Sequence, residues 1–224
     1  MRLKSAEGAA EQRNPFSTKQ LQTLFDSPLY TGCKSQRERS ATGITNMART
    51  AWFWLPLLGL FSGARLNELC QLHVSDVRVE EGIHYLALTA ENDEQRLKTK
   101  ASKRRCPLHS LPLSLGFLSF VEERKAEGAT LLFAEVKQDK LGYYSSQMTK
   151  DFSGYLKKIN AKTAKTSFHS LRHNFKDECI RAGVPSSIMD ALQGHVSSGM
   201  SDATVSVTKA LCMSLETFMR RLKA

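Results

Sequence analysis

The sequence predicts a mainly α-helical protein with a small antiparallel β-sheet, which places it in the α+β class. Two observations predict this class: apolar residues recur at helical spacing through most of the 224 residues, and only two short β-rich segments interrupt them. Hydrophobic residues make up 41% of the chain, as in folded globular proteins rather than disordered ones. A chain of this length can bury a core of ordinary size in one large domain or two small ones.

The first predicted helix follows a polar segment, residues 1–14, which we expect to be a flexible N-terminal linker remnant. Ser17 or Thr18 can cap this helix, because a side-chain oxygen at that position accepts from a free backbone N–H. The apolar face of the helix consists of Leu21, Leu24 and Phe25. A basic loop, TGCKSQRERSATGITN, follows it.

A strongly apolar helix is predicted over residues 47–61, and Gly63 breaks it. Its apolar stretch, AWFWLPLLGLF, has only 11 residues and contains Pro56, so it is too short to span a bilayer. A shorter helix, RLNELCQL, is predicted to run from this break with its leucines and Cys70 facing inward.

The sheet is predicted from two segments in the middle of the chain. IHYLALTAE (83–91) alternates in polarity and is rich in β-forming residues. RRCPLHS (104–110) is predicted as a second strand, which Pro107 places at an edge or a bulge. The basic stretch QRLKTKASKR between them is predicted as a hairpin or loop. The remaining helices are expected at 113–127, 145–160, 169–182 and 185–193, followed by an amphipathic segment at 207–222.

The charge of the chain favours an anionic partner. Lys and Arg number 32 against 22 Asp and Glu, which gives a formal net charge of +10. Nucleic acid is the first candidate and an acidic membrane the second. The short apolar stretch and a start without an apolar signal region argue against a membrane and against secretion, so we expect a cytoplasmic protein.

Neither the cysteines nor the histidines form a metal-binding pattern. The five cysteines are odd in number and include no CxxC pair, so we expect reduced thiols, with Cys70 and Cys179 in the core. The six histidines show no HExxH or other zinc spacing. We therefore expect no metal and no cofactor.

A polar cluster lies within the predicted helix SFHSLRHNFKDECIRAGV (167–184). His169, Arg172 and His173 fall within five positions, and the i, i+3 spacing puts His169 and Arg172 on one helical face. The simpler interpretation is a solvated first turn with scattered charge. The functional interpretation is an anionic oxygen, such as that of a phosphate, held by these side chains.

Three other segments also present basic groups at element boundaries. SGARLNEL presents Arg65 after a glycine break, LKTKASKRR presents Lys98 and Lys100 on the hairpin, and LQGH presents His195 at a helix end. Taken singly, each is more often a surface or packing residue than a functional one. Only their combination and order favour a shared site.

In this order the four segments resemble the catalytic domain of tyrosine recombinases, the phage-integrase family. The first arginine box of that family, TGxRxxEL, matches SGARLNEL at 62–69. Its hairpin lysine motif resembles LKTKASKRRCPLH, its HxxR box matches HSLR at 169–172, and its LGH box matches LQGH at 192–195. The resemblance implies the tyrosine-recombinase catalytic-domain fold over residues 15–202.

The resemblance also implies a reaction. Family members cleave one DNA strand by attack of a tyrosine on the scissile phosphate, which leaves a 3′-phosphotyrosyl link and a free 5′-hydroxyl. Arg65 and Arg172 would clamp the phosphate, since guanidinium groups offer paired donors in fixed geometry. Lys98, with Lys100 as the alternative, would protonate the leaving oxygen.

The other implied roles follow the same resemblance. His169 would assist proton transfer at the nucleophile, and His195 would donate to a phosphate oxygen. Lys100, Lys103 and Arg104 are expected to contact DNA. Both arginines of the clamp are expected to stand in a basic pocket rather than in structural ion pairs. The implied partners are double-stranded DNA and other integrase protomers on it, in a bacterial cytoplasm and at the nucleoid when DNA is bound.

The nucleophile is missing from its expected position. Family members carry the tyrosine about nine residues beyond the His of the LGH box, where this chain has Thr204. A threonine hydroxyl is less acidic than a phenol and too short to reach the same place. We therefore expect residues 203–224 to be an atypical C-terminal tail. The chain has tyrosines only at 30, 85, 143, 144 and 155, and the last three, which precede the HxxR box, are expected to be packing or surface residues.

The genetic code suggests a cause for this departure. Relatives commonly have Asp-Arg-Tyr-Gly-x-Gly-Tyr where this chain has DATVSVT (202–208), and deleting one nucleotide from one choice of codons for the former, with Ile at x, yields the latter. We interpret the end as frameshifted, with a naturally divergent tail as the alternative. The chain also begins almost at the catalytic domain, so a preceding DNA-binding domain is expected to be missing. The three functional hypotheses are a degenerate recombinase domain of a phage or mobile element, a non-catalytic DNA-binding regulator or competitor of an intact integrase, and an inert remnant.

Overall fold

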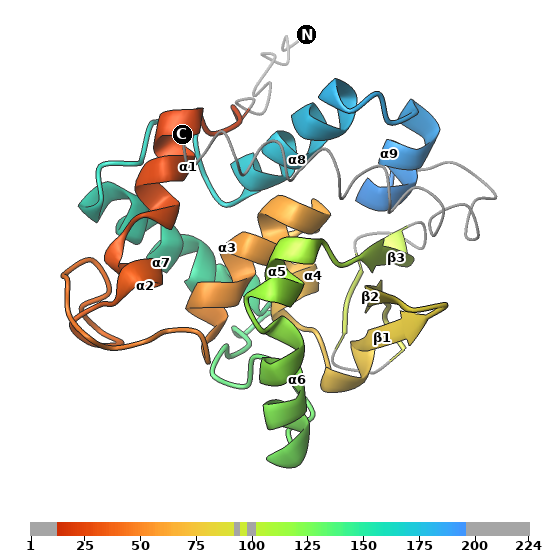
Figure 1. The fold of residues 1–224 in the computed structure, drawn as a ribbon, viewed down its shortest axis with the longest axis horizontal. Helices are drawn as coiled ribbons and strands as arrows, with labels where there is room; N and C mark the ends of the chain where they lie inside the picture. Colours follow the sequence, from red (N-terminus) through yellow and green to blue (C-terminus); the bar gives the residue numbers. More distant parts are fainter. Residues whose placement is uncertain (1–12, 92–94, 98–101, 196–224) are drawn as a thin grey trace, which may run out of the picture.

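The computed structural model describes residues 13–91, 95–97 and 102–195 (Figure 1). The first half contains α1 (Thr18–Phe25), α2 (Pro28–Thr31), α3 (Ala51–Ser62), α4 (Leu66–Cys70), the 3-10 turn η1 (Val74–Asp76), β1 (Val77–Glu80) and β2 (Ile83–Leu88). The second half contains β3 (Arg104–Pro107), α5 (Ser110–Ser114), α6 (Phe117–Ala126), α7 (Ser145–Lys158), α8 (His169–Arg181) and α9 (Ser186–Gln193). The predicted class, mainly α with a small antiparallel sheet, is confirmed.

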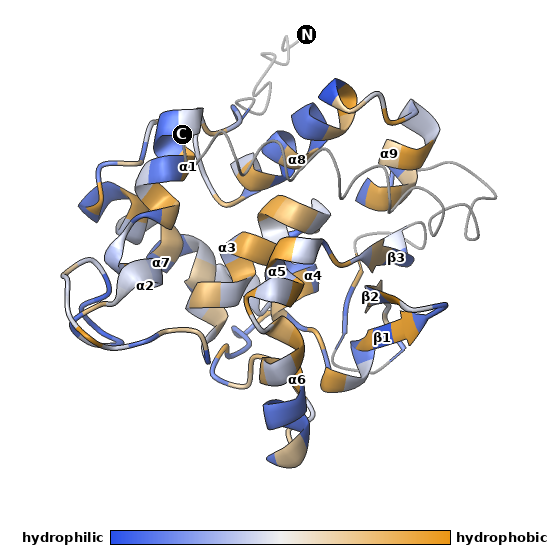
Figure 2. Ribbon diagram, viewed as in Figure 1, coloured by the Kyte–Doolittle hydropathy of each residue, from blue (hydrophilic) through white to orange (hydrophobic). Residues whose placement is uncertain are grey.

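Helix α3 is the centre of the fold. All of its residues are buried, as expected of a helix that is apolar on every side, and Figure 2 shows it hydrophobic along its length. It packs against α4 and α8. The helix begins at Ala51 rather than Met47, because Thr50 is its N-cap and the Glu135 carboxylate accepts from the Ala51 N–H at 2.6 Å.

Helix α1 begins where the sequence predicted. Ser17 caps it through a capping box with Gln20: the Gln20 N–H donates to Ser17 Oγ at 3.3 Å, and the Ser17 N–H donates to Gln20 Oε1 at 2.9 Å. Leu21 and Leu24 are buried, while Phe25 is half-buried. The cap prediction is therefore confirmed at Ser17.

The sheet has three strands in the order β1-β2-β3, so β1 was missed in the prediction. Its sequence, VRVE, lies mostly exposed and has no apolar run to reveal it. It pairs with β2 through a two-residue turn in which Glu81 and Gly82 have φ of 50° and 78°, as hairpin turns of this kind require. Pro107 lies on β3, an edge strand, as predicted.

One predicted helix was wrong in its extent. The segment 113–127 is two helices, α5 and α6, which Gly116 separates with φ of 90°. The two predicted strands also end earlier than expected, at Leu88 and Pro107. The other predicted helices are confirmed to within a few residues at their ends. The segment 207–222 lies outside the described residues.

The predicted state of the core cysteines is confirmed. Cys70 and Cys179 are buried free thiols, as are Cys33 and Cys106, whereas Cys212 lies outside the described residues. Across the described ranges, no helix is both long and apolar enough to cross a membrane. The same ranges contain no group of three or more His, Cys, Asp or Glu side chains placed to hold a metal ion.

Candidate functional site

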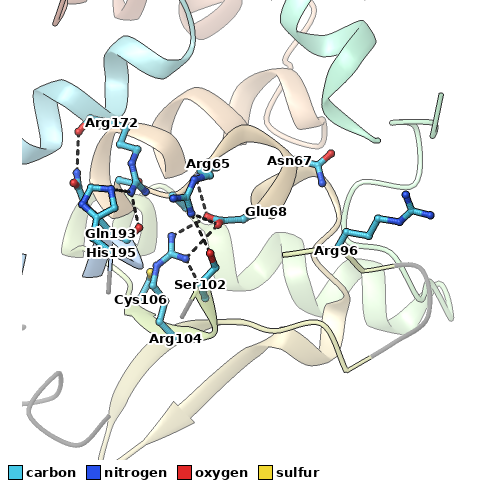
Figure 3. A network of polar contacts seen from close by, with 12 residues as sticks. Arg65, Asn67, Glu68, Arg96, Ser102, Arg104, Cys106, Arg172, Gln193 and His195 are labelled. Atoms are coloured by element: carbon cyan, nitrogen blue, oxygen red, sulfur yellow. Dashed lines mark hydrogen bonds and ion pairs between the residues drawn. The ribbon is translucent and has the colours of Figure 1, made fainter. Parts of the chain in front are cut away.

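The structure brings three distant segments together at the C-terminal end of α3 (Figure 3). Gly63 ends α3 in the left-handed conformation, with φ of 63°, and Arg65 follows as the N-cap of α4. Arg172 lies on α8, and His195 follows α9. Arg172 Nη2 and His195 Nε2 are 3.1 Å apart, and Figure 3 shows the Arg65 side chain beside them.

Arg172 is a buried cation without a carboxylate partner among the described residues. Its side chain donates to the backbone carbonyls of Gly63 and Gln193, and the residue is only 4% exposed. Burial, and then the charges of Arg65 and Arg104, lower the pKa of Arg172 to about 10. The guanidinium therefore remains charged at neutral pH, and a bound anion would stabilise that charge.

Arg65 is held by Glu68, whose carboxylate is almost fully buried. Arg65 Nη1 lies 2.8 Å from Glu68 Oε1, and the Arg65 N–H donates to Oε2 at 2.9 Å. Burial alone would raise the pKa of Glu68, but the charge and hydrogen bonds of Arg104 and Arg65 lower it below its ordinary value. The expectation that neither clamp arginine stands in an ion pair is thus wrong for Arg65. Its side chain is still 26% exposed, which leaves part of the guanidinium open to a ligand.

Arg104 was expected to contact DNA, but its side chain is only 5% exposed. Two of its hydrogen bonds go to the Glu68 carboxylate, at 2.8 and 3.3 Å. The others go to the Leu192 carbonyl at 2.7 Å and the Ser102 carbonyl at 2.8 Å. Arg104 therefore connects β3, α4 and the end of α9, and it supports Arg65 through the shared carboxylate.

Glu68 is a member of the arginine cluster that the sequence analysis missed. It stands three positions after Arg65 on the same helix, and its carboxylate accepts from the Arg65 backbone as the third residue of a capping box. This spacing within SGARLNEL was the available signal. The Glu68 carboxylate orients two arginines and reduces their mutual repulsion.

Two histidines border the arginines. Burial, and then the charges of His173, Arg172 and Arg65, lower the pKa of His169 to about 4. Burial and the charge of Arg172 lower the pKa of His195, against the opposing effect of Asp190, whose carboxylate lies 3.5 Å from Nδ1. His169 is therefore neutral at pH 7 and can accept a proton.

The hairpin side of the site is described only in part. Lys103 is exposed and forms an ion pair with Glu91 at 2.7 Å. Lys98 and Lys100 lie outside the described residues, and so does Thr204. A pocket of about 690 Å³ lies beside Arg65, and Arg96 and Tyr143 contribute to its lining.

The tyrosines were expected to be packing or surface residues. Tyr144 and Tyr155 are buried, and Tyr143 is 46% exposed. The Tyr155 hydroxyl donates to Ser27 Oγ at 2.7 Å. For these three tyrosines the expectation is confirmed.

A protein-family model described as the phage integrase family matches residues 16–208. The chain belongs to the phage integrase family. This confirms the resemblance read from the four sequence motifs. A search among curated proteins found no match to the chain.

Solved recombinase structures share the fold of this integrase-family chain. An integrase of the Tn1549 transposon, in complex with transposon right end DNA, aligns with a TM-score of 0.58 and 20% identity, covering 97% of this chain and 69% of that one. The XerH site-specific recombinase bound to difH substrate aligns with a TM-score of 0.57 and 18% identity, covering 96% and 54%. The XerA recombinase aligns with a TM-score of 0.54 and 16% identity, covering 98% and 67%. The fold is that of the tyrosine-recombinase catalytic domain, and the chain spans between about half and two thirds of the length of these proteins.

Proposed function

We propose that residues 15–202 are the catalytic domain of a site-specific recombinase of a phage or other mobile element, which binds double-stranded DNA in a bacterial cytoplasm. The observation that carries the proposal is Arg172, a buried guanidinium without a carboxylate partner in the described part of the chain, which lies beside Arg65 and two histidines. A phosphate diester supplies the negative charge that this cluster lacks. The DNA present in two of the similar structures supports the same ligand.

In this proposal Arg65 and Arg172 donate to the non-bridging oxygens of one DNA phosphate. Such donors stabilise the charge that develops during strand cleavage, because they are already oriented before the reaction. His169 would accept a proton, and His195 would donate to a phosphate oxygen. Lys98, or Lys100, is the proposed acid for the leaving oxygen.

We further propose that the chain binds DNA without forming a covalent link. Thr204 occupies the position of the family tyrosine in the sequence, and residues 203–224 are an atypical tail. A domain that binds but does not cut would compete with an intact integrase, or act as a regulator at its site. The domain would then also assemble with other integrase protomers on the same DNA molecule.

The binding proposal is tested with Arg65→Ala, which removes an exposed donor of the clamp. Arg49→Ala is the matched control, because Arg49 also pairs with carboxylates (Glu123 and Glu127) but lies outside the cluster. We expect Arg65→Ala to weaken DNA binding about tenfold or more, since a charge-assisted contact to phosphate contributes about 1.5–3 kcal/mol. Equal affinities for the two variants, measured by fluorescence anisotropy, would exclude Arg65 from the binding site.

Arg172 needs a different substitution. Arg172→Ala would leave the buried carbonyls of Gly63 and Gln193 without their donor, at about 1–3 kcal/mol each, so loss of binding could reflect unfolding. Arg172→Lys keeps the charge and removes the planar fork. We expect it to fold, by circular dichroism, and to bind DNA more weakly than wild type.

Covalent trapping tests the lost nucleophile. Wild type, Thr204→Tyr and a chain with 203–208 replaced by Arg-Tyr-Gly-Ile-Gly-Tyr are incubated with nicked attachment-site DNA. We expect no covalent product from wild type or from Thr204→Tyr, since misplacement of a nucleophile by about 1 Å can cost a hundredfold. The replaced segment should restore nucleophile and turn together. Trapping by the wild-type chain would show that it retains a nucleophile.

A further inference from the structure

A second basic pocket lies at the opposite end of α3 from the arginine cluster. It has a volume of about 360 Å³. Its lining residues come from the loop after α2, the start of α3 and helix α7, whose places in the fold Figure 1 shows. The side chains that matter for its chemistry are Arg37, Arg39, Trp52, Lys150, Asp151 and Lys158. The 12 residues of α3 separate the two sites by about 18 Å, at 1.5 Å per residue.

The pocket has an excess of positive charge. Arg37, Lys150 and Lys158 are exposed, and Asp151 is the single carboxylate against these cations and Arg39. Within the described residues none of the four cations forms a salt bridge, and Gln147 Nε2 donates to Asp151 at 2.8 Å.

Many surface cations elsewhere on the protein do have carboxylate partners. Arg49 pairs with Glu127, and Lys34 pairs with Glu38. The four cations of the pocket therefore remain together without such compensation, as is expected where an external anion binds.

Arg39 is oriented for an anion. Its guanidinium carbon lies 4.0 Å from the centroid of the Trp52 ring, a cation–π contact that fixes the plane of the side chain. Its Nε is buried and has no hydrogen-bond partner among the described residues. Buried donors of this kind are nearly always satisfied, so a missing partner indicates an acceptor from outside the chain.

We propose that this pocket binds a phosphate group of the DNA backbone at a site separate from the arginine cluster. The inference rests on the proposed DNA binding. A duplex carries one phosphate per 3.4 Å of axis on each strand, so about 18 Å corresponds to roughly five base pairs and one duplex is long enough to meet both sites. A second copy of the chain is a poorer occupant, because two chains of formal charge +10 repel each other.

The test compares two double variants that change the charge equally. Lys150→Gln/Lys158→Gln removes two exposed lysines of the pocket. Lys125→Gln/Lys137→Gln removes two exposed lysines outside both sites. The affinity of each for a duplex of arbitrary sequence is measured over a range of salt concentrations, after circular dichroism has shown that both fold.

We expect the pocket variant to reduce the slope of log K against log salt by about 0.9, the value for one phosphate contact, and the control to match wild type. An equal reduction in both variants, or none in either, would overturn the proposal. Inorganic phosphate is titrated in parallel with tryptophan fluorescence as the readout. Saturable phosphate binding that the pocket variant abolishes, with an unchanged DNA slope, would assign the pocket to a free anion and overturn the DNA assignment.

Arg65→Ala, measured in the same series, separates this inference from the proposed function. A loss of affinity in Arg65→Ala with a normal slope in the pocket variant would overturn only the second site. Arg65→Ala could instead bind DNA with normal affinity while the pocket variant shows a reduced slope. That result would overturn only the proposal that the arginine cluster is the main DNA contact.

Discussion

Glu68 holds the candidate site together at the scale of single residues, because one buried carboxylate pairs with both Arg65 and Arg104. The distances to the two guanidiniums are both 2.8 Å, and the Arg104 side chain is almost completely shielded from water. A buried cation that loses its partner retains its desolvation cost and has no compensating charge. The effect of a substitution at Glu68 therefore depends more on Arg104 than on Arg65.

We expect Glu68→Gln to lower the free energy of unfolding by about 3 kcal/mol, since removing one partner of a buried ion pair costs about 3–5 kcal/mol and the amide retains some hydrogen bonds. Urea denaturation measures the change. Glu127→Gln removes an exposed carboxylate that pairs with Arg49 and Arg124 and should cost less than about 1 kcal/mol. Similar losses in the two variants would show that Glu68 is no more than a surface partner.

We expect His169 to make DNA binding depend on pH. In the free protein burial, together with the charges of His173 and the arginines, lowers its pKa to about 4. A bound phosphate adds negative charge nearby and raises that pKa, so binding takes up a proton and affinity increases as pH falls from about 7 towards 5. His169 is exposed to solvent, which screens part of this effect.

The DNA affinity of His169→Gln should depend less on pH than that of wild type. A smaller pH dependence should remain, because His195 is still present. The measurement is fluorescence anisotropy at constant ionic strength across this pH range. His84→Gln, on β2, removes a histidine outside the cluster and should retain the full dependence. An unchanged pH profile in His169→Gln would mean that His169 does not face the phosphate.

At the scale of secondary-structure elements, the break between α3 and α4 positions Arg65. Gly63 makes this break with φ of 63°, and an added Cβ would lie 2.4 Å from Phe175 Cδ1 on α8. Glycine is thus required twice, by the backbone conformation and by the close packing of α8. Both requirements act at a position two residues before Arg65.

Gly63→Ala is expected to cost about 2–5 kcal/mol, from about 1–2 kcal/mol of backbone strain and about 1–3 kcal/mol of overpacking. Gly183→Ala is the matched control, because Gly183 has φ of 69° and open space where the Cβ would lie. Gly183→Ala should therefore lose only the part of the free energy of unfolding that comes from backbone strain. If both variants lose the same free energy of unfolding, measured by heat or urea, then Phe175 moves aside for the added methyl group. The contact would then not constrain the break between α3 and α4.

At the scale of the whole molecule, the formal charge of +10 predicts binding that depends strongly on salt. Neutralising roughly six phosphates would give a slope of log K against log salt of about −5. Titration of a short duplex from low to physiological salt measures the slope. An affinity that stays constant over this range would contradict an electrostatic interface.

Most of the helices and the family could be predicted from the sequence, because both depend on patterns within short segments. The capping box at Ser17 is local, as are the apolar run of α3 and the spacing within SGARLNEL and HSLR. β1 could not be predicted in the same way. Its side chains are mostly exposed, and only pairing with β2 makes it a strand.

The sequence by itself predicted that Arg65, Arg172 and the two histidines lie together, and the structure places them near one another. Only the tertiary structure decided how they are supported: Arg104, predicted as a DNA contact, lies buried against Glu68 and the end of α9. Burial and ion pairing depend on which distant segments meet, and residue spacing does not report this. The same is true of the pocket around Arg39, whose cations come from a loop and from α7, more than 100 residues apart in sequence. Charge composition predicted an anionic partner for the whole chain, but the packing of α2, α3 and α7 decided where unpaired cations gather.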